Sequence, residues 1–81
     1  MEIKIDERAM KDLSKLDKNI ALNILDKIEL LKNYPYTPNI KKLTNFNPKF
    51  RYRVGDYRIL FDIESRALTI YRVLHRKKAY D

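Results

Sequence analysis

The chain has 81 residues, a formal net charge of +7, one histidine and no cysteine. A chain of this length forms one small domain, so we expect a single domain over residues 1–81. The lack of cysteine excludes disulfides and thiolate metal sites, and a single histidine argues against a histidine-based metal cluster. No apolar run approaches the roughly 20 residues of a membrane span, and residues 1–6 lack the apolar core of a signal peptide. We therefore expect a cytoplasmic protein with no metal, no cofactor and no membrane partner.

The positive charge is concentrated in the second half of the chain. Residues 1–33 contain seven basic and seven acidic side chains, whereas residues 49–80 contain nine basic side chains and three acidic ones. Six of these nine are arginines, and the planar guanidinium suits phosphate better than the point charge of lysine. A balanced half followed by a basic half is typical of nucleic-acid binding. The alternative is a solvated basic surface without a ligand.

The first half of the chain predicts one strand and two helices. Glu2–Ile5 alternates polar and apolar residues, as a short strand does. Asp6 is placed to cap a helix that runs to about residue 16, and Asp17 to cap a second helix that runs to about residue 33. Leu22 and Leu30 lie off the apolar stripe of the second helix, so they either flank the core or contact a partner. The apolar residues that share one face of each helix, and that we expect in the core, are Ala9, Leu13 and Leu16, then Ala21, Ile24, Leu25, Ile28 and Leu31.

The second half of the chain predicts strands. Pro35 and Pro38 end the second helix, because proline cannot continue a helix. We expect a short extended piece over residues 43–46, and then three strands over residues 50–54, 57–63 and 68–74, joined by turns. The predicted fold class is α+β, with two N-terminal helices packed on one face of a small, mainly antiparallel, four-stranded sheet.

Three arginines lie within eight residues around the only glycine of the chain, Gly55. Gly55 and Asp56 are expected to form a tight turn, because glycine adopts a positive φ without steric cost. Arg51 and Arg53 should then point to the same face of the strand before the turn, and Arg58 adds a third guanidinium after it. Asp56 is the only acid within this run, so we expect the arginines to face a polyanion.

The order of the elements and two motifs resemble the RelE/ParE superfamily of small toxins from toxin–antitoxin modules. The motifs are Tyr-Arg-Val-Gly-Asp-Tyr-Arg at residues 52–58 and His-Arg-Lys-Lys-Ala-Tyr at residues 75–80, and the second favours the RelE branch. Membership of that branch implies a metal-independent endoribonuclease that cuts mRNA on the ribosome, inhibits translation and is silenced by a bound antitoxin. ParE-like members share the fold but inhibit DNA gyrase, and a non-catalytic RNA-binding module is a further alternative.

RNA cleavage without a metal uses the neighbouring 2′-OH as nucleophile, so the site must supply a base, an acid and cations for the charged phosphorane. The resemblance implies that Arg58 and Arg76 bind the phosphate, and that Tyr80 acts as a base or stacks on a nucleobase. His75 is placed to act as an acid or base, or else has a structural role. The identity of the general base stays open at this point.

Two further arginines have alternative roles. By resemblance, Lys49 and Arg51 match a basic pair of the family's catalytic site, although the family has two lysines there and arginine is a poor base because it stays protonated. Arg53 either contacts RNA or braces the turn by pairing with Asp56 or Asp62. The basic side chains that we expect to bind RNA outside the chemistry are Lys41, Lys42, Lys49, Arg53, Lys77 and Lys78.

The expected protein partner is an acidic, partly disordered antitoxin. The basic half of the chain should attract it from a distance, and Leu22, Leu30 and a short sheet edge offer apolar anchors. The expected nucleic-acid partner is mRNA on the ribosome. Neither a small-molecule cofactor nor a membrane is expected.

Overall fold

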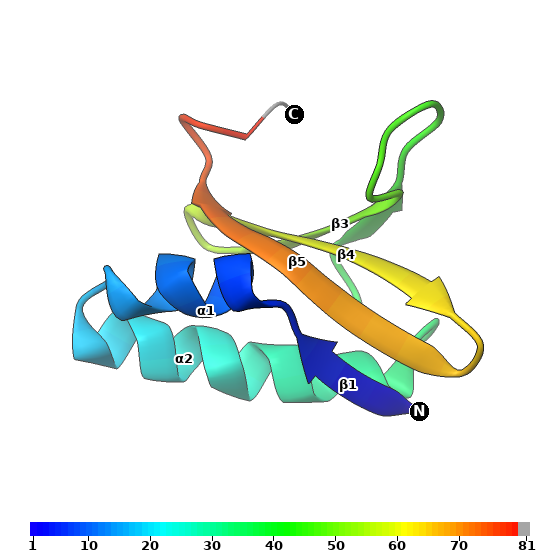
Figure 1. The fold of residues 1–81 in the computed structure, drawn as a ribbon, viewed down its shortest axis with the longest axis horizontal. Helices are drawn as coiled ribbons and strands as arrows, with labels where there is room; N and C mark the ends of the chain where they lie inside the picture. Colours follow the sequence, from blue (N-terminus) through cyan, green and yellow to red (C-terminus); the bar gives the residue numbers. More distant parts are fainter. Residues whose placement is uncertain (80–81) are drawn as a thin grey trace.

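Two helices lie against one face of a five-stranded sheet, and the other face of the sheet carries no helix within residues 1–79 (Figure 1). This computed structural model describes residues 1–79. The segment between the second and third strands and the segment after the last strand both rise on the helix-free side. The elements are β1 (Glu2–Ile5), α1 (Glu7–Ser14), α2 (Lys18–Glu29), the 3₁₀ helix η1 (Leu30–Asn33), β2 (Ile40–Lys42), β3 (Phe50–Val54), β4 (Tyr57–Glu64) and β5 (Ala67–His75).

The strand order is β1-β5-β4-β3-β2, with β1 parallel to β5 and the other pairs antiparallel. The α+β class and the mainly antiparallel sheet are therefore confirmed, but the sheet has five strands instead of four. The additional strand is β2, which pairs with β3. The predicted extended piece over residues 43–46 is wrong, because the chain turns there and Asn45 has a φ of 62°.

Both predicted helix starts are confirmed by their caps. The carboxylate of Asp6 accepts a 3.0 Å hydrogen bond from the backbone N–H of Arg8, and that of Asp17 accepts a 2.9 Å bond from Asn19. The helix ends differ slightly from expectation, since α1 ends at Ser14 and the last turn before Tyr34 tightens into η1.

The core lies between the helices and the sheet. The rings of Phe50 and Phe61, on neighbouring strands, stack with centroids 5.1 Å apart. The predicted helix stripes are confirmed for the five residues that are fully buried, while Leu16, Ala21 and Leu25 pack at the margin of the core. The buried apolar residues are Ala9, Leu13, Ile24, Ile28, Leu31, Phe50, Tyr52, Val54, Ile59, Phe61, Leu68, Ile70 and Val73.

A β-bulge in β5 changes which side chains reach the helix-free face. The pairing of β5 with β4 shifts in register between Ile70 and Arg72, so Tyr71 is an extra residue. Ile70 and Val73 are both buried in the core, three positions apart. Tyr71 and Arg72 are therefore adjacent residues that both line a hollow on the opposite face.

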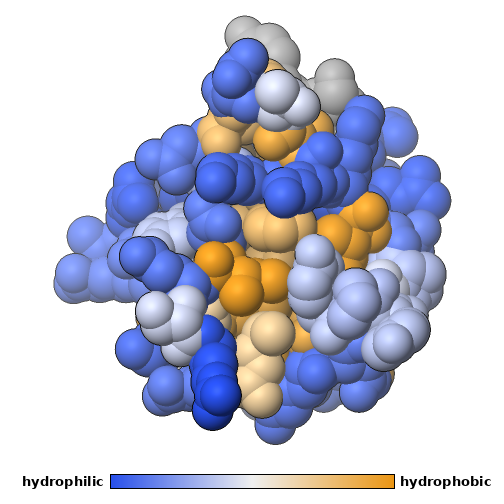
Figure 2. Space-filling view, turned by 90° about the vertical axis from the view of Figure 1, so that its right-hand side faces the viewer, coloured by the Kyte–Doolittle hydropathy of each residue, from blue (hydrophilic) through white to orange (hydrophobic). Residues whose placement is uncertain are grey.

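Several large apolar side chains are exposed on the surface, among them Leu22 at 50% and Leu30 at 44%. At the end of the molecule where β4 turns into β5, apolar side chains gather in the middle and hydrophilic ones surround them (Figure 2). Within the part of the chain that the structure describes, no helix is long and apolar enough to cross a membrane.

Candidate nucleic-acid interface

A basic hollow of about 480 Å³ opens on the helix-free face of the sheet. Its four cations come from three neighbouring strands, which the register aligns: Lys41 lies opposite Arg51, and Arg53 lies opposite Arg58. Like charges placed directly opposite each other on a sheet are destabilising, so this arrangement favours the binding of an anion. The residues that line the basic hollow are Asn39, Ile40, Lys41, Arg51, Arg53 and Arg58.

Two of these cations are held almost out of solvent. Arg51 is 8% exposed and Arg58 is 9% exposed, whereas Arg53 is exposed. Partial exclusion of water lowers the effective dielectric and strengthens the interaction of a guanidinium with a phosphate. The two nearly buried arginines are therefore placed to hold an anion in a fixed position.

Arg58 also braces the turn between β3 and β4. Its Nη1 donates hydrogen bonds of 3.2 Å to the main-chain oxygens of Gly55 and Tyr57. Gly55 has a φ of 58°, the left-handed conformation that was expected of it. The turn therefore fixes the direction of the Arg58 side chain toward the basic hollow.

The alternative in which Arg53 braces the turn is wrong. The carboxylate of Asp56 lies 3.8 Å from Nε of Arg76, and that of Asp62 accepts a hydrogen bond from the backbone of Ile63. Arg53 makes no ion pair within residues 1–79. It lines the basic hollow as a solvated cation.

The first two residues of the C-terminal motif make different contacts. Arg76 lies beside the β3–β4 turn, because its backbone N–H donates a 2.7 Å bond to Asp56. His75 instead packs its ring edge-on against Tyr57, with centroids 5.4 Å apart, and its Nδ1 accepts a bond from Lys77. His75 does not line the basic hollow. Tyr80 lies outside the described residues.

The predicted RNA-binding lysines also differ in position. Lys41 lines the basic hollow, whereas the ammonium of Lys42 lies 5.8 Å from the centre of the Phe50 ring. Lys49 is exposed directly before β3, and Lys77 and Lys78 are exposed in the turn after β5.

A second hollow, of about 390 Å³, lies on the same side of the sheet and was missed by the sequence analysis. Tyr71 reaches it through the bulge, which has no signal in the sequence because it depends on how β4 and β5 pair. The residues that line it are Arg8, Asn47, Pro48, Leu60, Tyr71, Arg72 and Leu74.

Asp12 of α1 secures the edge of β5 beside this hollow. Its carboxylate accepts bonds of 2.8 and 3.1 Å from the Arg72 guanidinium and 2.9 Å from the backbone N–H of Val73. Burial by itself raises the pKa of Asp12, but these hydrogen bonds outweigh it and hold the pKa below its ordinary value. The same contact raises the pKa of Arg72.

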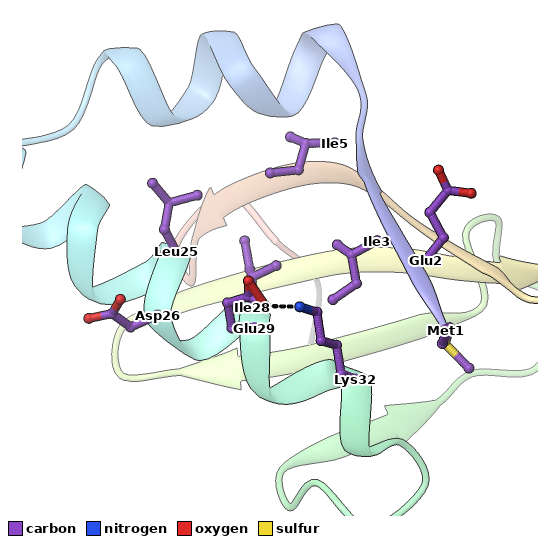
Figure 3. A pocket seen from close by; sticks show the side chains of 9 residues that line it. All are labelled: Met1, Glu2, Ile3, Ile5, Leu25, Asp26, Ile28, Glu29 and Lys32. Carbon is purple, nitrogen blue, oxygen red and sulfur yellow. Dashed lines mark ion pairs between the residues drawn. The ribbon is translucent and has the colours of Figure 1, made fainter.

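A groove of about 530 Å³ lies between β1 and α2 (Figure 3). β1 is at the opposite edge of the sheet from β2, so this groove is separate from the basic hollow. β1 is an edge strand within the described chain, so its outer side has no neighbouring strand. An ion pair of 2.7 Å between Glu29 and Lys32 lies at the rim. The apolar side chains that line the groove are Met1, Ile3, Ile5, Leu25 and Ile28.

A metal site is not evident in residues 1–79, where no three His, Cys, Asp or Glu side chains lie close enough together to hold an ion. On the helix-free face, the side chains that line the two hollows provide cations beside an aromatic ring and apolar groups.

Comparison with known proteins identifies the family. Residues 3–80 match the sequence model of the family described as ParE toxin of type II toxin–antitoxin system, parDE. A stretch of 43 residues is 42% identical to Toxin RelE3 of Methanocaldococcus jannaschii, and the match spans 53% of this chain but only 49% of that relative.

Two solved complexes have a chain with the same fold. The RelB–RelE antitoxin–toxin complex from Methanococcus jannaschii matches with a TM-score of 0.73 and 30% identity, covering 91% of both chains. The toxin–antitoxin complex RelBE2 from Mycobacterium tuberculosis matches with a TM-score of 0.78 and 28% identity, covering 93% of this chain and 96% of that one. The chain therefore belongs to the ParE toxin family of type II toxin–antitoxin systems, within the RelE/ParE superfamily.

Proposed function

We propose that this toxin is an endoribonuclease that cuts mRNA on the ribosome and so inhibits translation. The observation that carries the proposal is the basic hollow, in which Arg51 and Arg58 are nearly buried beside Arg53 and Lys41. Four cations around one hollow suit a phosphodiester whose negative charge increases in the transition state. The relationship to proteins named RelE favours the same activity.

In the proposed chemistry the neighbouring 2′-OH loses its proton to a base and attacks the scissile phosphate. The bond from phosphorus to the 5′ oxygen then breaks, and an acid protonates the departing 5′ oxygen. Arg51 and Arg58 stabilise the phosphorane, and Arg76 adds a cation from beside the β3–β4 turn. Tyr80 and His75 are the proposed proton-transfer groups, with Tyr80 also able to stack on a base. Since the His75 ring packs on Tyr57, its participation requires the C-terminal end of β5 to move when RNA binds.

Gyrase inhibition is the second candidate function, because the family model that matches residues 3–80 is named after ParE toxins. A gyrase inhibitor acts by binding a protein, so it needs no arrangement of cations around a phosphate. The basic hollow therefore favours the nuclease over the gyrase inhibitor.

Mapping mRNA ends in cells after brief induction of the toxin distinguishes these functions. A nuclease of this kind should produce new ends in phase with translated codons and leave chromosomal DNA intact. Intact mRNA with DNA damage would establish the gyrase activity instead. RNA binding without new ends would leave only a non-catalytic binding module.

We also propose that a co-encoded acidic antitoxin binds the toxin, since the related solved structures are complexes with RelB-type antitoxins. Exposed Leu22 and Leu30 and the apolar groove beside β1 offer anchors, while the net charge of +7 should speed association. A Leu22→Glu, Leu30→Glu double variant should dissociate from the antitoxin faster than wild type, and Asn23→Glu serves as the control. An unchanged dissociation rate would remove this flank of α2 as an anchor.

A further inference from the structure

The second hollow adjoins the basic hollow on the helix-free face. Arg51 pairs directly with Leu60 across β3 and β4, and Arg58 pairs directly with Leu74 across β4 and β5. Directly opposite side chains on neighbouring strands share a face, with Cβ atoms about 4.5–5.5 Å apart. Each pair joins one residue of the basic hollow to one residue of the second hollow. A ligand that fills the first hollow therefore has the second beside it.

The second hollow has a different chemical character from the basic one. Its lining includes two leucines, a proline and the ring of Tyr71. Its two arginines are already paired with acids, Arg72 with Asp12 at 2.8 Å and Arg8 with Asp6 at 3.3 Å. The second hollow therefore offers an aromatic ring and apolar side chains, together with Asn47 and two arginines whose charges are already compensated.

The bulge is the reason that an aromatic ring reaches this surface. Without the extra residue, Tyr71 and Arg72 would point to opposite faces, and one of them would enter the core. Asp12 fixes Arg72 and the backbone of Val73 directly after the bulge. The bulge and the contacts of Asp12 therefore hold Tyr71 in place at the edge of β5.

We propose that the second hollow binds a nucleobase of the RNA whose phosphate occupies the basic hollow, with Tyr71 as the stacking ring. The inference rests on the proposed function and names a base-binding subsite for it. A cationic groove with a neighbouring aromatic ring is the usual design for single-stranded nucleic acid, because every base has a face that stacks. A stretch of acidic peptide would be attracted by the same cations but has no group that requires the ring.

The experiment measures cleavage of a defined mRNA in a purified translation system, with the ends mapped to single nucleotides. Tyr71→Ala should lower the cleavage rate about tenfold, as the loss of one stacked base does. It should also weaken the preference for particular bases at one fixed position relative to the cut. Tyr71→Phe keeps the ring and should behave as wild type. Tyr36→Ala removes an exposed tyrosine elsewhere and should change neither quantity.

Arg58→Ala distinguishes the role of the basic hollow from that of the second hollow, because it should lower the cleavage rate without changing the base preference. If Tyr71→Ala cuts at the wild-type rate with the wild-type preference, the subsite is refuted and the nuclease stands. The same result combined with weaker antitoxin binding would assign the hollow to the antitoxin instead. If wild type makes no cuts, the proposed function and this inference fail together. Tyr71→Leu retains apolar bulk without a ring and replaces Tyr71→Ala if that variant does not fold.

Discussion

Alternating residues of β3 and β4 point to opposite faces of the sheet, and the two faces differ in chemical character. Toward the helices, Phe50 pairs with Phe61 and their rings stack, and both are buried. On the helix-free face, Arg53 pairs with Arg58, which places two positive charges opposite each other. Packed apolar pairs stabilise a sheet, whereas like charges in the same relation weaken it. The comparison indicates that one face holds the fold together and that the other is arranged for a ligand.

The largest effect on stability is expected on the helix side. Phe61→Ala removes a ring that is completely buried and leaves a cavity, so the free energy of unfolding should fall by about 3–5 kcal/mol. Urea denaturation measures this change. Tyr36→Ala, which removes an exposed ring, is the control, and a similar loss in both variants would contradict the difference between buried and exposed rings.

The largest effect on activity is expected on the helix-free side. Arg58→Ala should lower the cleavage rate by about 10²–10³, as the loss of one electrostatic contact to a transition state does. It should lower stability by only about 1 kcal/mol per hydrogen bond to the turn that is lost. Lys27→Ala, on the helix side, is the charge-matched control. A folded Arg58→Ala protein with wild-type cleavage would refute the assignment.

A smaller, pH-dependent effect is expected where α1 meets β5. Asp12→Ala should lower the free energy of unfolding by about 2 kcal/mol at pH 7, because a charged acceptor of three hydrogen bonds is lost. The pKa of Asp12 is lowered in the folded state, so its stabilisation is complete above its ordinary pKa of 3.8 and is lost as the pH falls through the lowered pKa.

Urea denaturation at pH 7 and pH 3 tests this dependence. The difference between wild type and Asp12→Ala should be smaller at pH 3 than at pH 7. Asp26→Ala removes an exposed carboxylate and should show little change at either pH. A difference that is constant with pH would show that Asp12 acts through packing alone.

The smallest effect is expected on the salt dependence of RNA binding, which should differ between two neighbouring lysines on opposite faces of β2. Lys41→Ala should reduce the salt dependence of RNA binding by about one phosphate contact, because Lys41 lines the basic hollow. Lys42→Ala should leave that dependence unchanged, because its ammonium lies over the Phe50 ring. Binding measured over a range of salt concentrations checks both variants, and equal slopes would show that the two faces of β2 do not differ for RNA.

Local signals in the sequence were sufficient for much of this architecture. The caps at Asp6 and Asp17 were predictable because each carboxylate bonds to a backbone N–H only two residues away. The common face of Arg51 and Arg53 followed from strand alternation, and the turn followed from the single glycine.

Features that depend on pairing between distant segments could not be predicted. β2 has three residues and is defined only by its partner β3, and the bulge at Tyr71 exists only in the register of β4 with β5. The side of the sheet on which His75 lies also depends on that register, since Tyr57 is its partner. The cations of the basic hollow could therefore be predicted from the sequence, whereas the second hollow beside them could not.

The parallel pairing of β1 with β5 has a consequence for the timing of synthesis. Glu2 pairs with Ala67 and Ile5 with Ile70, so β1 leaves the ribosome well before β5, the strand to which it is hydrogen-bonded. Contacts between such distant positions form late. A stalled nascent chain should gain protease resistance only once residues 67–75 have left the exit tunnel. The newly made toxin thus becomes able to act only after β5 has been synthesised.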